Sequence, residues 1–132
     1  MHFRSLPFIT ILVMLPGLAN ASPAMPEGRY CGKLFSAGEI VAAETTFEFG
    51  QGGSISGHYE FRDGNVVTDG WLKEADREMG RTHLLIWHDR YGQGQLTVTF
   101  DRNFESFDGY WGTNAPVPDH IWIGERCQEP IS

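Results

Sequence analysis

Histidine and aspartate are the first residues in this sequence that could do chemistry. His88 and Asp89 stand side by side near the end of a strand-like stretch and could act as a ligand or as an acid/base pair. His58, His83 and His120 follow elsewhere, but no two histidines have the two-residue spacing that places zinc or copper ligands on one face of a strand. His83 and His88 are five residues apart, so they point to opposite faces. The pattern favours solvated or singly hydrogen-bonded histidines, and we expect no metal and no cofactor.

Nucleophilic and carboxylate catalysis have little support. No serine lies in a nucleophile-elbow pattern, and both cysteines are expected to be bridged. Paired aspartates near loops or strand ends could act on a glycoside, but nothing sets a distance between any two of them. The five candidates are Asp63, Asp89, Asp101, Asp108 and Asp119. Aspartate commonly shapes turns because its side chain binds local backbone, so no catalytic residue is identified.

Aromatic residues are more informative than the charged ones. Large rings can fill the interior of a small barrel, or they can line a pocket or platform that stacks on a ligand. The rings considered are Trp71, Trp87, Trp111, Trp122, Tyr59, Tyr91 and Tyr110. Most are expected to be structural, while Trp87, Tyr91 and Tyr110 break an internal repeat described below and are better candidates for a ligand. The candidate ligand-binding set is therefore Trp87, His88, Asp89, Tyr91, Tyr110 and Asn114.

Strands must position these residues, because no sustained 3.6-residue apolar period occurs. Short runs rich in Val, Ile, Thr and aromatics are separated by Gly, Asp and Asn. The sole helix candidate is 74–79, which Gly80 would end. Tight turns are expected at 50–53 and 63–65. Eight strands are predicted near 32–36, 44–50, 54–61, 65–73, 82–88, 95–101, 106–112 and 119–126.

Two halves of the chain align when one is shifted by about 51 residues. The half repeats span about 32–81 and 82–127, and four strand segments match at nearly constant offset. Similar hydrophobicity alone could produce part of this likeness, since alternating strands resemble one another. The alignment predicts a duplicated four-stranded unit. It places Leu34-Phe35 on Leu85-Ile86, 45–49 on 96–100, 54–59 on 106–111, and Trp71-Leu72 on Trp122-Ile123.

The cysteines discriminate between the two folds that suit eight antiparallel strands, a closed up-and-down barrel and a two-sheet sandwich. In a closed barrel the first and last strands are neighbours. Cys31 and Cys127 would then lie on adjacent strands at the same end, within the roughly 7 Å between α-carbons that a disulfide allows. We therefore predict an all-β, eight-stranded antiparallel up-and-down barrel with a Cys31–Cys127 disulfide, and keep the sandwich as the alternative.

The first 21 residues have the pattern of a secretory signal peptide. Arg4 precedes the apolar run 6–15, Pro16 breaks it, and small residues end at Ala21. A membrane anchor needs roughly 20 uninterrupted apolar residues, more than are present here. We expect cleavage after Ala21, a single β-barrel domain over 22–132 with no membrane span, and a secreted or periplasmic location, in which a disulfide is stable.

Charge excludes one class of partner. The chain has 10 Lys and Arg against 17 Asp and Glu, and loss of Arg4 changes the formal charge from −7 to −8. The basic residues are scattered rather than clustered, so nucleic acid is not an expected partner.

The predicted plan resembles the calycin-like barrels, lipocalins and avidins among them, in size, strand count and export. The Gly-x-Trp signature that opens lipocalins is replaced here by Gly28-Arg29-Tyr30, and no stretch matches an avidin biotin site. The resemblance is therefore architectural, and no functional residues are carried over.

Loops at one end of the meander are the expected place for binding, because a rigid barrel commonly presents its site there. These loops are 36–43, 62–65, 89–94 and 113–119. The first hypothesis is an exported, non-enzymatic barrel that binds a small ligand, a glycan or a protein. The alternatives are a hydrolase or isomerase that uses loop carboxylates and His88, and a secreted inhibitor or interaction protein with an acidic loop surface.

Overall fold

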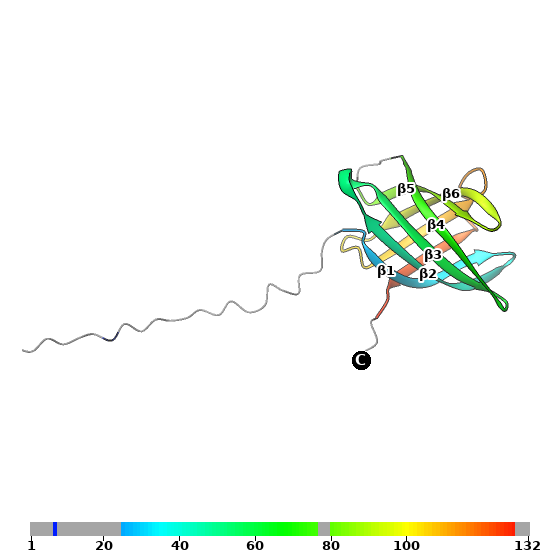
Figure 1. The fold of residues 1–132 in the computed structure, drawn as a ribbon, viewed down its shortest axis with the longest axis horizontal. Helices are drawn as coiled ribbons and strands as arrows, with labels where there is room; N and C mark the ends of the chain where they lie inside the picture. The colour runs from blue at the N-terminus through cyan, green and yellow to red at the C-terminus, as the bar shows by residue number, and fades with distance from the viewer. Residues whose placement is uncertain (1–6, 8–24, 77–79, 129–132) are drawn as a thin grey trace, which may run out of the picture.

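The computed structural model describes residue 7 and residues 25–76 and 80–128, and it shows one closed antiparallel barrel (Figure 1). Each strand pairs with the next along the chain, and β8 pairs with β1. This closure confirms the up-and-down barrel and rules out the sandwich. The strands are β1 (Gly28–Ser36), β2 (Glu39–Phe49), β3 (Ile55–Asp63), β4 (Val66–Asp76), β5 (Thr82–Asp89), β6 (Gly92–Phe100), β7 (Ser106–Gly112) and β8 (Ile121–Arg126).

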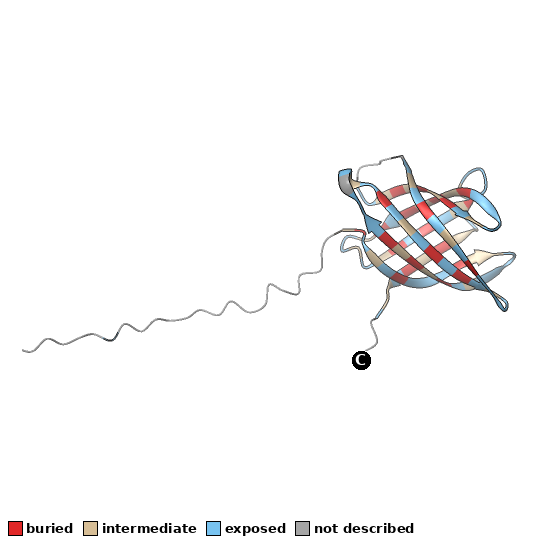
Figure 2. Ribbon diagram, viewed as in Figure 1, coloured by how far each residue is buried: buried red, intermediate tan, exposed pale blue. Residues whose placement is uncertain are grey.

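Alternation of residue type along the strands produces the core. On β3, Ile55, Tyr59 and Phe61 are buried, whereas Ser56, His58 and Glu60 are exposed. Figure 2 shows the same alternation of buried and exposed positions around the barrel. Thr45 and Phe47 of β2 are buried in the same way. Because the inward face of the strands is mainly apolar, a shift of one residue in register would expose the core.

The seam between β1 and β8 carries the disulfide. Five residue pairs join these strands, from Tyr30 opposite Arg126 to Leu34 opposite Trp122. The α-carbons of Cys31 and Cys127 lie 5.0 Å apart and their sulfurs are bonded, as predicted. A disulfide is consistent with an oxidising compartment, such as the periplasm or the cell exterior.

The first six strands are longer than the sequence suggested, whereas β7 has the predicted bounds and β8 is shorter. The predicted loop 36–43 is a two-residue turn: Ala37 and Gly38 both have positive φ, which suits a tight hairpin, and β2 begins at Glu39. The helix expected over 74–79 is wrong for its first three residues, which belong to β4; residues 77–79 lie outside the described part of the chain. Glu74 is held in the barrel by partners on other strands, and this tertiary pairing overrides local helix propensity.

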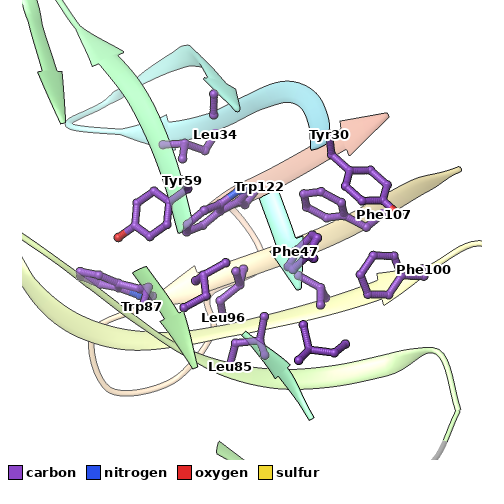
Figure 3. Close-up of a cluster of buried hydrophobic side chains, with 14 of the residues drawn as sticks. Tyr30, Leu34, Phe47, Tyr59, Leu85, Trp87, Leu96, Phe100, Phe107 and Trp122 are labelled. Carbon is purple, nitrogen blue, oxygen red and sulfur yellow. The ribbon is translucent and has the colours of Figure 1, made fainter. Parts of the chain in front are cut away.

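Aromatic rings fill one end of the interior, which we call the closed end. Tyr30, Phe47, Phe100 and Phe107 pack mostly edge to face, with ring centroids 5.2–6.0 Å apart. The Tyr30 hydroxyl donates to the carbonyl of Phe104 at 2.6 Å. Figure 3 shows these rings at one end of the core and Tyr59 and Trp87 at the other. The interior is therefore packed here, and any usable space lies at the opposite end.

A buried hydrogen-bonded pair, Glu74 and His83, also lies near the closed end. Glu74 accepts from the backbone N–H of Ile55 at 2.8 Å with one carboxylate oxygen, and the other lies 2.7 Å from Nδ1 of His83. The side chains of Glu74 and His83 are only 4% and 8% exposed. This accounts for His83 as a structural residue, which was the favoured interpretation.

Two sequence predictions are not decided by the fold. The signal peptide lies in residues 1–21, nearly all outside the described part of the chain. For the duplication, Tyr59 and its match Trp111 both line the same pocket, but Trp71 is exposed and its match Trp122 is buried. Similarity of sequence therefore does not mean similarity of orientation in every strand, and the duplication stays a prediction. The described part of the chain contains no helix with the length and hydrophobicity that crossing a membrane requires.

Reduction of the Cys31–Cys127 bond should lower the melting temperature by on the order of 10 °C, because a 96-residue separation gives a stabilisation of up to ~4–5 kcal/mol on the chain-entropy model. Thermal unfolding followed by circular dichroism, with and without reductant, measures the shift. A Cys31→Ser/Cys127→Ser variant controls for side effects of the reductant and should melt at the same lowered temperature in both conditions. Identical curves for the oxidised and reduced wild type would contradict a stabilising seam.

Replacement Glu74→Ala should destabilise the fold by about 3 kcal/mol, since it leaves His83 and the Ile55 N–H buried without their acceptor. Urea unfolding measures the loss. Glu48→Ala, an exposed position on β2, is the matched control and should change the free energy of unfolding by less than about 0.5 kcal/mol. Equal effects of the two replacements would show that the buried pair contributes nothing special.

Candidate ligand-binding site

The end of the barrel opposite the disulfide holds an open pocket. Four connections meet there, and they join β1 to β2, β3 to β4, β5 to β6 and β7 to β8. The pocket has a volume of about 230 Å³, which is smaller than the ~300–1,000 Å³ typical of drug-sized ligands. Its lining is Leu34, Phe35, Ser36, Ala37, Tyr59, Phe61, Asp63, Trp87, Asp89, Tyr91, Trp111 and Trp122. We call this cavity the mouth pocket.

Three tryptophans line the mouth pocket with their indole N–H groups already bonded. Trp87 donates to the carbonyl of Gly112 at 3.2 Å, and Trp111 donates to the carbonyl of Phe35 at 2.9 Å. Trp122 donates to the hydroxyl of Thr45 at 3.0 Å. Since their only donors are used, these rings offer apolar faces and edges to whatever enters the pocket.

Contacts between rings hold these walls in place. Trp87 and Trp111 meet edge to face with centroids 5.6 Å apart, and Tyr59 and Trp122 do so at 4.6 Å. Rings that are hydrogen-bonded through their polar atoms and packed edge to face have few conformations before a ligand arrives. They therefore lose little conformational entropy when a ligand binds. The pocket is therefore largely pre-formed.

Tyr59 and Asp89 supply the polar contact in the pocket wall. The Tyr59 hydroxyl donates to Oδ2 of Asp89 at 2.7 Å, and the backbone N–H of Tyr91 donates to Oδ1 at 2.8 Å. Figure 3 shows the Tyr59 ring with its hydroxyl directed away from the packed core. Burial, and then the hydrogen bond to the Asp89 carboxylate, raise the pKa of Tyr59 well above its usual range. This hydroxyl therefore stays a proton donor and fixes the orientation of Asp89.

Two glycines make room for the pocket rings. A Cβ atom at Gly70 would lie 2.2 Å from the Tyr59 ring, and one at Gly94 would lie 2.7 Å from the Trp87 indole. Both strands can pass directly beside a large ring only because no side chain stands there. Either position should be intolerant of alanine, since the ring would have to move.

Exposed apolar side chains surround the opening. Ile40, Val66, Val67, Tyr91 and Val117 lie in or next to the four connections, and each is between 37% and 59% exposed. Arg90 lies against the outer rim, with its guanidinium carbon 5.6 Å from the centroid of the Tyr91 ring. The entrance thus continues the aromatic and aliphatic character of the pocket.

The predicted site residues divide between the two faces of the barrel. Trp87, Asp89 and Tyr91 line the mouth pocket. His88 lies on the outer face, where it stacks on Trp71 with centroids 5.0 Å apart. Because consecutive strand residues point to opposite faces, His88 and Asp89 do not form the acid/base pair that the sequence suggested.

Tyr110 and Asn114 do not line the pocket. Tyr110 is 43% exposed on the outer face of β7, and Asn114 is exposed in the connection after that strand. The sequence correctly predicted that the four loops share one end of the barrel. Neither Tyr110 nor Asn114 is among the residues that line the pocket at that end.

Most of the pocket wall was missed as a site. Tyr59, Trp111 and Trp122 were interpreted as core because they match across the half repeats, yet each has a face on the cavity. Alternation placed them inside the barrel, but it gives no depth along the axis. Distance along the sequence from the four turns could have identified these residues as pocket residues. Tyr59, Trp111 and Trp122 each lie within about five residues of a strand end at the mouth.

Among the described residues, no three His, Cys, Asp or Glu side chains are grouped so that they could hold a metal ion. No family model matches this sequence, and no curated protein matches it significantly.

Stability should fall as the pH rises from about 10 to about 12, since burial raises the pKa of Tyr30 to about 12 and that of Tyr59 well above its usual range. Tyrosines of the unfolded chain ionise near pH 10, so in this window the unfolded state binds fewer protons than the native state. Urea unfolding at pH 8, 10 and 11 measures the loss. A Tyr30→Phe/Tyr59→Phe variant should lose less with pH, and Tyr110→Phe is the control for tyrosine content; a flat wild-type profile would contradict the burial argument.

Proposed function

We propose that this protein is an exported, non-enzymatic binding protein that takes a small, mainly apolar ligand into the mouth pocket. The observation that carries the proposal is a pre-formed cavity of about 230 Å³ whose wall is made of ring faces with satisfied polar atoms. Sites for small molecules are commonly concave, apolar and provided with a few placed polar groups.

The packing of the rest of the barrel supports the same function. The closed end is filled with rings, so a ligand has one way in and one way out. An apolar pocket wall that faces water normally costs stability, because burial of apolar surface is favourable. Hydrogen bonds hold the wall rings of the mouth pocket in place and keep it open. This arrangement supports ligand binding more than it supports imperfect packing.

The enzyme hypothesis, which combined loop carboxylates with His88, is not supported by the position of His88. His88 stacks on Trp71 outside the barrel, while Asp89 lines the pocket inside. No observation favours the inhibitor hypothesis over binding of a small ligand.

Binding of small aromatic compounds should change the emission of the three pocket tryptophans. The measurement is best made in a Trp71→Phe background, because Trp71 is 47% exposed on the outer face and would add an unresponsive signal. The panel holds neutral, cationic and anionic compounds of about ten heavy atoms, for which micromolar to millimolar dissociation constants are reasonable. Isothermal titration calorimetry confirms each hit.

A blocking variant tests whether the mouth pocket is the site. Ser36 lines the pocket rim, so Ser36→Trp should place a ring in the opening and weaken binding at least about tenfold. Ser56→Trp adds the same ring at an exposed position of β3 and should bind as the parent does. No response to any compound, or equal binding by the two variants, would overturn the proposal.

A further inference from the structure

Asp89 is a carboxylate in an aromatic wall and has no cationic partner among the residues that the structure describes. Its two oxygens accept hydrogen bonds from Tyr59 and from the Tyr91 backbone, both of which are neutral donors. Among the described residues, no Lys, Arg or His forms an ion pair with Asp89 or with Asp63, the second carboxylate of the pocket. Partly buried carboxylates normally have a partner of opposite charge.

The hydrogen bonds leave Asp89 able to receive a further donor. Each carboxylate oxygen has two acceptor positions, and the described part of the chain donates one hydrogen bond to each. The bonds also hold the carboxylate still, since one partner is a buried tyrosine and the other is the backbone of the same turn. An incoming N–H group would therefore meet an acceptor that is already oriented.

The rings around Asp89 also suit a positive charge. Tyr59, Trp87, Trp111, Trp122 and Tyr91 line the same cavity, and the faces of Trp and Tyr attract cations. The rim already shows this contact, because the guanidinium of Arg90 lies over the Tyr91 ring. The acidic charge of the chain, −7 for all 132 residues, further attracts cations to the opening.

We propose that the mouth pocket selects small organic cations, with an ammonium nitrogen at Asp89 and an apolar or aromatic body against the tryptophan rings. This rests on the proposed function and adds the chemical class of the ligand. An ammonium group gains both a charge-assisted hydrogen bond and contact with ring faces. A fatty acid or other carboxylate is disfavoured, because its anionic group would approach two carboxylates.

Three compounds that share one body separate charge from shape. Phenethylamine, 2-phenylethanol and 3-phenylpropionate all carry a phenethyl group, and at pH 7 they are a cation, a neutral molecule and an anion. Calorimetry on the oxidised protein at 50 mM salt should show phenethylamine binding at least about tenfold tighter than 2-phenylethanol, since a hydrogen bond to a charged group is worth about one to two powers of ten. The anion should bind most weakly.

An isosteric variant assigns the preference to one residue. Asp89→Asn keeps the side-chain shape, and its amide can still bond Tyr59 and the Tyr91 N–H. It should lower the affinity for phenethylamine at least about tenfold and leave that for 2-phenylethanol within about twofold. Asp108→Asn removes the same charge from an exposed position of β7 and should leave both affinities unchanged.

The outcomes separate this proposal from the function beneath it. Equal or tighter binding of the neutral or anionic compound, with loss in Ser36→Trp, would overturn the cation preference and keep the binding function. A cation preference that survives in Asp89→Asn would overturn the role of Asp89. Failure of all three compounds to bind would overturn the cation preference, whereas the binding function is overturned only if no compound of the wider panel binds.

Discussion

The ladder between β1 and β8 is the interaction on which the rest of this structure depends. It turns a meander with two free edges into a cylinder in which every strand has two neighbours. Without it, the N–H and C=O groups of two edges would be unpaired, and the inward faces would not enclose a common interior. Cys31 and Cys127 lie at one end of this ladder, where the N–H of Cys127 also bonds the carbonyl of Arg29. The covalent link thus holds together the contact that defines the fold.

The two ends of the interior differ because their aromatic rings are held differently. At the closed end, phenylalanines without polar atoms pack against one another around Tyr30 and fill the space. At the mouth, each tryptophan is tied by its N–H group to the wall, so the rings cannot collapse into the middle. The same residue class therefore makes a core at one end and a cavity at the other. Hydrogen bonding to the wall, more than ring size, separates the two outcomes.

Asp89 contributes both to a turn and to the wall of the mouth pocket. Its Oδ1 atom accepts a hydrogen bond from the backbone N–H of Tyr91, and this bond shapes the hairpin between β5 and β6. Its Oδ2 atom receives the Tyr59 hydroxyl from a strand on the other side of β4. The interpretation of this aspartate as a turn former is therefore supported, and the same side chain lines the mouth pocket. What the turn adds is a carboxylate that faces a pocket and not solvent.

Local sequence determined the strands, their inward faces and, through the two cysteines, the closure of the barrel. These features depend on neighbouring residues or on a single long-range constraint, so a pattern with period two and one disulfide suffice to specify them. The secondary-structure prediction was wrong where residues on other strands determine the conformation. Glu74, predicted to begin a helix, belongs to β4, where it is hydrogen-bonded to His83 and to the backbone of Ile55. Only the tertiary structure decided which inward rings end in the core and which face a cavity. That depends on depth along the barrel axis and on the bonds of each indole, and both are set by strand register across the whole sheet.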